Sequence, residues 1–141
     1  TDMNGDGTLS ADDVWQWDRT PEDLNGDGFP DICRSSFKDT DAFQCLMNPA
    51  KEAGHWIVVR LVGEQSNRFG IGARVEARAG GVTFVGEVLT TTSAFTAVHP
   101  QVHFGLGEAE RIDSLVVRWP SGVTTGLEDV SVDQIITVTE Q

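Results

Sequence analysis

Short runs rich in Val, Ile and Thr recur through the second half of the chain, and residues typical of turns separate them. In the run 71–79, apolar and charged residues alternate, and Gly80-Gly81 then leads into the run 82–88. Alternation with a period of two places successive side chains on opposite faces of a strand. A Gly-Gly pair between two such runs is a hairpin signal. This half of the chain is therefore predicted to form strands.

The predicted strands cover residues 55–62, 71–79, 82–88, 93–98, 102–106, 112–119 and 134–140. Several short strands at this spacing are typical of an antiparallel sandwich or barrel. We predict a mainly β chain, an antiparallel β-sandwich of roughly seven to eight strands, preceded by a small calcium-loop segment with one short helix. We assign residues 1–50 to the calcium-loop segment with its disulfide loop, and residues 54–141 to the sandwich.

Near the start of the chain, residues 2–13 place oxygen-bearing groups at alternate positions of a loop. This spacing is typical of the EF-hand calcium loop, with Gly7 at its sharp turn and Asp13 in place of the usual Glu. Ser10 followed by Asp13 also resembles a capping box, which predicts the short helix over 11–18. The predicted ligands are Asp2, Asn4, Asp6, Thr8 through its carbonyl, Ser10 and Asp13.

A second stretch, residues 23–31, repeats the Asn-Gly-Asp-Gly pattern. Its twelfth position is Arg34, which cannot bind a cation, so the loop is expected to close at its ninth position. Metal-free turns are the alternative, but carboxylates that converge without a cation repel one another. We predict a second Ca²⁺ site, hence about two ions in total. Its ligands are Asp23, Asn25, Asp27, Phe29 through its carbonyl and Asp31.

Three resemblances accompany these patterns. The first loop resembles the calcium repeats of dockerins and EF-hands, and the second resembles the shorter loop of integrin-type propeller repeats. The phrases GEQSNRFGIGARV, HFGLG and VRWPSG, with HWIVVRLVG before them and DQIITVTE after, resemble the ASPIC/UnbV domain over about residues 54–140. That resemblance implies a secreted or surface protein, and it brings no catalytic residues to this chain.

The chain has two cysteines, Cys33 and Cys45, in a polar stretch that we interpret as a loop. Two cysteines are too few for a closed zinc site unless histidines join them. We predict a disulfide between them, which would stabilise the fold by roughly 3 kcal/mol through the unfolded chain. A disulfide implies an oxidising compartment.

The net charge of −12 disfavours nucleic acid as a partner, because a phosphate backbone repels such a chain. No apolar run approaches the roughly 20 residues that span a bilayer, so we expect no membrane insertion. We expect residue 1 to be a processed or truncated start, and the location to be extracellular or the cell surface.

Catalytic patterns are weak. No G-x-S-x-G elbow occurs, and Glu108, Glu110 and Asp113 are expected to form a solvated acidic face rather than a glycosidase pair. Trp56 and Trp119 lie on predicted strands and are expected in the core. Arginines that alternate with acids on the strands are expected to form cross-strand ion pairs on an outer face: Arg60, Arg74, Arg78 and Arg118.

Together these patterns predict a protein that is not an enzyme but a calcium-stabilised structural or adhesion module. Its expected partner is another protein or a second copy of itself in an extracellular assembly or filament. The alternative is a carbohydrate-binding module of a larger extracellular protein, with a glycan as its ligand.

Overall fold

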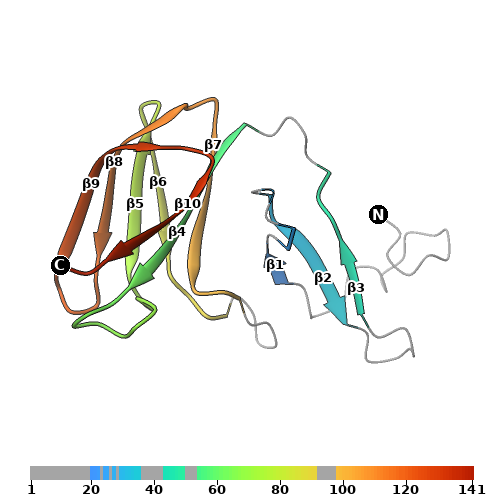
Figure 1. The fold of residues 1–141 in the computed structure, drawn as a ribbon, viewed down its shortest axis with the longest axis horizontal. Helices are drawn as coiled ribbons and strands as arrows, with labels where there is room; N and C mark the ends of the chain where they lie inside the picture. The colour runs from blue at the N-terminus through green and yellow to red at the C-terminus, as the bar shows by residue number, and fades with distance from the viewer. Residues whose placement is uncertain are drawn as a thin grey trace. The chain divides into compact units, whose positions relative to one another are not determined.

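The computed structural model describes residues 20–22, 24, 25, 27, 29–35, 43–49, 54–91 and 98–141, with the backbone alone at 20–22, 33–35, 43 and 44. These residues form ten strands (Figure 1). Strands β1–β3 belong to one compact unit and β4–β10 to another, and each unit is described by itself. Within the described ranges, no helix has the length and apolar character needed to cross a membrane.

The smaller unit is an antiparallel sheet in the order β1-β2-β3. Its strands are β1 (Thr20–Glu22), β2 (Asp31–Ser35) and β3 (Phe43–Leu46). The interpretation of the cysteine stretch as a loop was wrong, because β2 and β3 carry Cys33 and Cys45. A polar composition indicates only that a segment is exposed to solvent, and an exposed strand can be as polar as a loop.

The larger unit contains seven of the strands, in two sheets (Figure 1). One sheet has the order β10-β4-β7 and the other β6-β5-β8-β9. Their bounds are β4 (His55–Val62), β5 (Arg74–Ala79), β6 (Val82–Glu87), β7 (Gln101–Gly107), β8 (Arg111–Arg118), β9 (Thr124–Ser131) and β10 (Gln134–Thr139). The prediction of a mainly β fold is confirmed.

One strand pair departs from the predicted antiparallel arrangement. β10 runs parallel to β4, with Gln134 opposite Ile57 and Thr139 opposite Val62. The first and last strands of the larger unit are therefore neighbours. A parallel pair is joined by a long crossover rather than by a tight turn, so turn residues in the sequence cannot predict the pairing.

The core lies between the two sheets and follows the alternation seen in the sequence. On β5, for example, Val75, Ala77 and Ala79 are buried, whereas Arg74 and Arg78 are exposed. Other buried members of the core come from both sheets: Ile57, Val59, Leu61, Val102, Phe104, Leu106, Ile112, Leu115, Val117, Trp119 and Val138. The inward faces of the strands thus form one continuous hydrophobic core.

One strand of the larger unit was not predicted, and two predicted elements lie wholly or mostly outside the described residues. β9 was not predicted, since its sequence TTGLEDVS contains Gly and acidic residues and only a weak alternation. Of the predicted strand 93–98, the structure describes only Val98, which lies outside any strand. The helix predicted over 11–18 falls outside the described residues.

Gly86 on β6 tests how closely the sheets pack. A methyl group at this position would collide with Val102 Cγ1 and crowd Phe104, both of β7. We expect Gly86→Ala to lower the free energy of unfolding by about 1–3 kcal/mol through overpacking. Urea denaturation measures this change.

Gly126→Ala on β9 is the matched control, because a methyl group there meets no atom within 4 Å. It should leave the stability unchanged or raise it by about 0.5–1 kcal/mol, since Ala restricts the unfolded chain more than Gly does. Equal effects of the two substitutions would contradict the described packing.

Candidate functional site

The second acidic loop is held by hydrogen bonds between its own side chains and backbone. Asp27 N donates to Asn25 Oδ1 at 3.1 Å, and Phe29 N donates to Asp27 Oδ1 at 2.9 Å. Asn25 Nδ2 also donates to Asp27 Oδ2 at 2.8 Å. Short polar side chains that bond to the backbone two residues further on favour such a turn. The loop therefore gathers Asn25 and Asp27 in one exposed bend.

Asp31 closes this loop and is fully buried. Its Oδ2 accepts a hydrogen bond from Leu24 N at 2.9 Å, and its Oδ1 accepts one from Asn48 N at 2.7 Å. The pKa of Asp31 is lowered mainly by the Asn48 amide and then by the Leu24 amide, against the opposing effect of burial. The carboxylate is therefore ionised at neutral pH, and it links the loop to the segment after β3.

The structure covers the predicted metal ligands only in part. Asn25, Asp27, Phe29 and Asp31 are described, whereas Asp23 is not. Among the described residues, no group of three or more His, Cys, Asp or Glu side chains converges on one point. All the predicted ligands of the first loop lie outside the described residues: Asp2, Asn4, Asp6, Thr8, Ser10 and Asp13.

The sequence reasoning missed one part of this site, the contribution of Asn48. Its backbone amide donates to Asp31, and its side-chain Nδ2 lies 3.5 Å from the carbonyl oxygen of Pro30. The contact spans seventeen positions along the chain. No spacing rule within the loop could have indicated a donor from so far away.

The backbone places the two cysteines of the predicted disulfide opposite each other. The Cα atoms of Cys33 and Cys45 are direct partners in the β2–β3 ladder. Directly opposed residues of antiparallel strands lie within the Cα–Cα range that a disulfide requires. The pairing of these two positions favours the bond, which stays a prediction.

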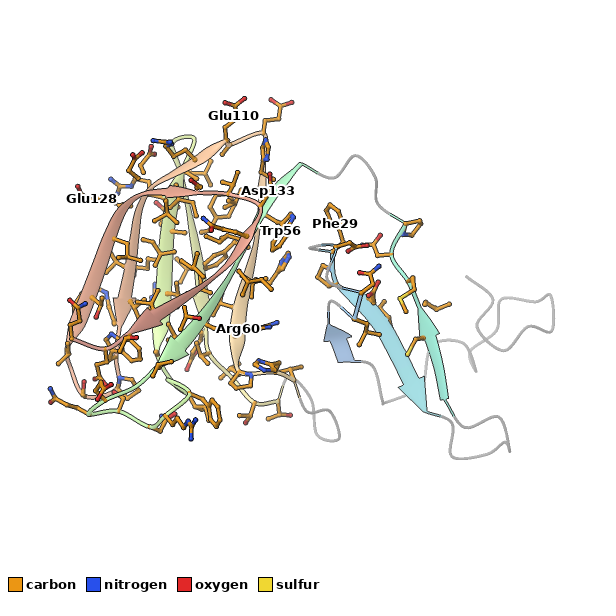
Figure 2. The ribbon with its side chains drawn as sticks, viewed as in Figure 1. Phe29, Trp56, Arg60, Glu110, Glu128 and Asp133 are labelled. Carbon is orange, nitrogen blue, oxygen red and sulfur yellow. The ribbon has the colours of Figure 1, made fainter. Side chains whose placement is uncertain are left out.

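The outer face of the β10-β4-β7 sheet carries an aromatic pair. The rings of Trp56 and His103 stack with centroids 6.2 Å apart and planes inclined by 7°. Four positions further along β4, Arg60 Nε donates to Gln101 Oε1 on β7 at 3.0 Å (Figure 2). Trp119 is buried as predicted, but the prediction of a core position for Trp56 was wrong, since Trp56 lies half-buried on the face away from the core.

Asp133, which precedes β10, forms hydrogen bonds to the start of β4 (Figure 2). Its Oδ2 lies 2.7 Å from His55 Nδ1, and its Oδ1 accepts a hydrogen bond from Trp56 N at 3.1 Å. An ionised carboxylate only accepts, so His55 carries a proton on Nδ1. This hydrogen bond is the main cause of the lowered pKa of Asp133. The sequence reasoning did not identify this pair.

Two of the four strand arginines, Arg74 and Arg118, form the predicted ion pairs on the outer face of the β6-β5-β8-β9 sheet, whereas Arg60 on the other sheet donates to Gln101 instead. Glu76 Oε1 lies 3.2 Å from Arg74 Nε and 3.7 Å from Arg118 Nε. The side chains of both arginines are more than half exposed, so these pairs add little to stability. Glu108, Glu110 and Asp113 are also exposed, as a solvated acidic face requires.

A buried carboxylate next to the end of the chain gathers the largest set of donors. Glu140 is 3% exposed, and its Oε2 accepts from the backbone amides of Glu64, Gln65 and Ser66 at 2.7–2.8 Å. Its Oε1 accepts from the hydroxyl groups of Ser66 and Ser121. Burial alone would raise the pKa of Glu140, but these hydrogen bonds lower it to about 2.

The donors to Glu140 given above all belong to the chain itself, so the cluster links separate segments of the larger unit. It joins the loop after β4, the turn after β8 and the end of β10. Two of these segments lie in the phrases GEQSNRFGIGARV and VRWPSG, which carry the resemblance to the ASPIC/UnbV domain. Those phrases therefore contribute to the architecture of the larger unit.

Comparison with known proteins bears on this larger unit. The sequence model of the family described as ASPIC and UnbV matches residues 63–141. The match begins directly after β4 and includes the Glu140 cluster and both flanks of the WPSG turn. None of the curated proteins matches the chain.

The Glu140 cluster generates a prediction about acid stability. Because the pKa of Glu140 is lower in the folded chain than the usual 4.5, its stabilising effect is complete above pH 4.5. The effect is lost as the pH falls through about 2. We expect Glu140→Gln to lower the melting temperature at pH 7 and to flatten the decline of stability between these two pH values. Thermal melts followed by circular dichroism measure both changes.

Glu108→Gln removes the same charge from an exposed position and serves as the control. Its melting temperature should follow that of the wild type across this range. A Glu140→Gln protein with the wild-type pH profile would rule out the proposed role of the carboxylate.

Proposed function

The chain belongs to the ASPIC and UnbV family, and from this premise we propose that it is a calcium-stabilised structural or adhesion module. It would act in a secreted or surface protein and associate with another protein or with further copies of itself. The larger unit supplies a stable β-sandwich, and the acidic loops of the smaller unit supply the cation sites. The protein would not be an enzyme.

The observation that carries this proposal is the environment of Asp31. Its carboxylate is fully buried and its pKa is lowered, so a negative charge is held inside the smaller unit. Among the side chains that the structure describes, none forms an ion pair with it. A buried charge is costly unless it is paired or binds a metal. A cation at this loop would supply the missing positive charge.

The residues of the loop fit Ca²⁺. The Asp31 carboxylate accepts backbone amides from Leu24, Asn25 and Asn48, and its two oxygens together offer about four lone-pair sites. Asn25 and Asp27 add amide and carboxylate oxygens, which are the hard ligands that calcium prefers. Asp23, Asn25, Asp27, Phe29 through its carbonyl and Asp31 would hold the ion, which would supply positive charge and cross-link the loop.

A structural role for the ion agrees with the construction of the smaller unit. Its three strands have between three and five residues each, and Ile32 and Leu46 are exposed. Strands this short bury little apolar surface by themselves, and metal binding is one way to supply folding free energy. Extracellular calcium modules bind at about 10⁻⁴ to 10⁻³ M, which suits a permanently bound ion outside the cell.

We expect calorimetry to detect about two Ca²⁺ sites in protein freed of metal by a chelator. Asp27→Ala should abolish one of them, because Asp27 is an exposed ligand whose loss leaves the buried Asp31 contacts in place. Light scattering with calcium, and again after chelation, then tests whether the ion promotes assembly.

Asp113→Ala is the control for charge, since Asp113 is an exposed carboxylate on β8 of the sandwich. It should keep both sites. The calcium proposal fails if the wild type binds no calcium, or if Asp27→Ala and Asp113→Ala bind the same number of ions.

The competing function is glycan binding on the outer face of β4 and β7. Here the observation is the stacked pair of Trp56 and His103, with the polar groups of Arg60 and Gln101 beside it. Aromatic rings next to hydrogen-bonding groups are common in ligand sites. In this case Trp56→Ala would abolish binding to a glycan array, while Val85→Ala on the other sheet would not. A wild type that binds no glycan would leave the assembly proposal as the better one.

A further inference from the structure

Four strands form the ends of the two sheets of the larger unit: β10 and β7 in one, β6 and β9 in the other. β6 and β7 approach one another across the sandwich. β9 and β10 therefore lie at the opposite margin, and they form no backbone ladder with each other; Gln134 Nε2 of β10 donates to Ser131 O of β9 at 2.9 Å. Each has one side along which its backbone amides and carbonyls find no strand within the described part of the chain.

These end strands differ in how their sequences protect them. Natural sheets guard exposed edges with charges, bulges, Pro or irregular backbone. β6 ends in Gly-Glu, β7 contains two glycines, and β9 contains Gly126, Glu128 and the positive-φ residue Asp129. β10, QIITVT, has no charge, no Gly and no Pro. It is the end strand of this unit that lacks such protection.

Apolar side chains flank this unprotected edge on both faces. Ile135 lies on the outer face of β10 and is 45% exposed. Leu127 of β9 is paired with the buried Leu115, so it lies on the core side, yet it is 38% exposed. The open margin of the sandwich thus leaves an apolar strip beside backbone groups that can pair.

We propose that β10 pairs antiparallel with β10 of a second copy of this chain, so that the two β10-β4-β7 sheets become one continuous sheet. The charge of the chain favours this occupant. Each copy carries a net charge of −12, so a contact between identical surfaces must avoid acidic residues. The uncharged β10 edge meets this condition, whereas the β9 and β6 edges would bring carboxylates close to their own copies.

The alternation of β10 also suits pairing with itself. A two-fold axis through Thr137 places Thr137 opposite its copy and Ile135 opposite Thr139 on the outer face. The same register places Ile136 opposite Val138 on the core side. Each side chain keeps the face that it has in the single copy, so the contact requires no rearrangement of the core. Thr–Thr and aliphatic cross-strand pairs are favourable.

This inference rests on the self-association in the proposed function, but it involves no calcium ligand. The dimer should therefore form after chelation. Sedimentation equilibrium of the full chain in EDTA tests it, with the expected result a concentration-dependent dimer. A wild type that remains monomeric at its highest soluble concentration in EDTA would overturn the inference.

Thr137→Glu is the decisive variant. Thr137 lies opposite Arg60 of β4, so a glutamate there gains a cross-strand partner within its own copy. In the dimer, the same glutamate would face its copy across the two-fold axis. We expect the dimer dissociation constant to rise by about tenfold or more, while the melting temperature of the monomer is preserved.

Thr83→Glu on β6 is the matched control, because Thr83 is an exposed residue of an end strand and lies opposite Arg78. It should dimerise as the wild type does. The inference fails if Thr137→Glu dimerises normally or if both variants dissociate equally. An EDTA-stable dimer in a protein that binds no calcium would support this inference while refuting the calcium proposal.

Discussion

The carboxylate of Glu140 connects three segments that are distant in sequence but adjacent in the larger unit. Its two oxygens receive donors from residues 64–66 and from Ser121, while its own backbone amide donates to Val62 O at the end of β4. The parallel alignment of β10 on β4 and the position of the turn after β8 both depend on this one group. Because the carboxylate itself is buried, the loss of its donors would leave a charged group with unsatisfied oxygens.

Much of the larger unit could be predicted from its sequence, because alternation records which face of a strand meets the core. β5 follows this rule closely, with a buried residue at every second position, and β8 follows it from Leu115 to Val117. β9 could not be predicted from its sequence, because it lies at the end of its sheet, where Gly and acidic residues are tolerated. The parallel partner of β4 comes more than seventy residues later. Local pattern carries no information about a pairing of that kind.

The candidate calcium site also has features that local sequence predicts and features that depend on residues distant in the chain. The spacing of Asn25 and Asp27 indicated a polar loop, since each of these short side chains accepts from the backbone amide two positions further on. The burial of Asp31 and its bond to Asn48 arise from folding of β3 beside β2, which spacing cannot express. The family could be identified from the glycine-bearing phrases because they mark turns that the sandwich requires. Family membership alone does not name a ligand.

The parallel pairing of β4 and β10 has a mechanical consequence. Residue 55 begins the first strand of the larger unit and residue 139 ends the last, and these two strands lie side by side. A tensile force that enters at residue 55 and leaves at residue 139 therefore acts along the ladder rather than across it. The hydrogen bonds between the strands then share the load and must break together, instead of opening one after another. Chain direction at a single strand pair thus gives the unit the geometry of a shear joint.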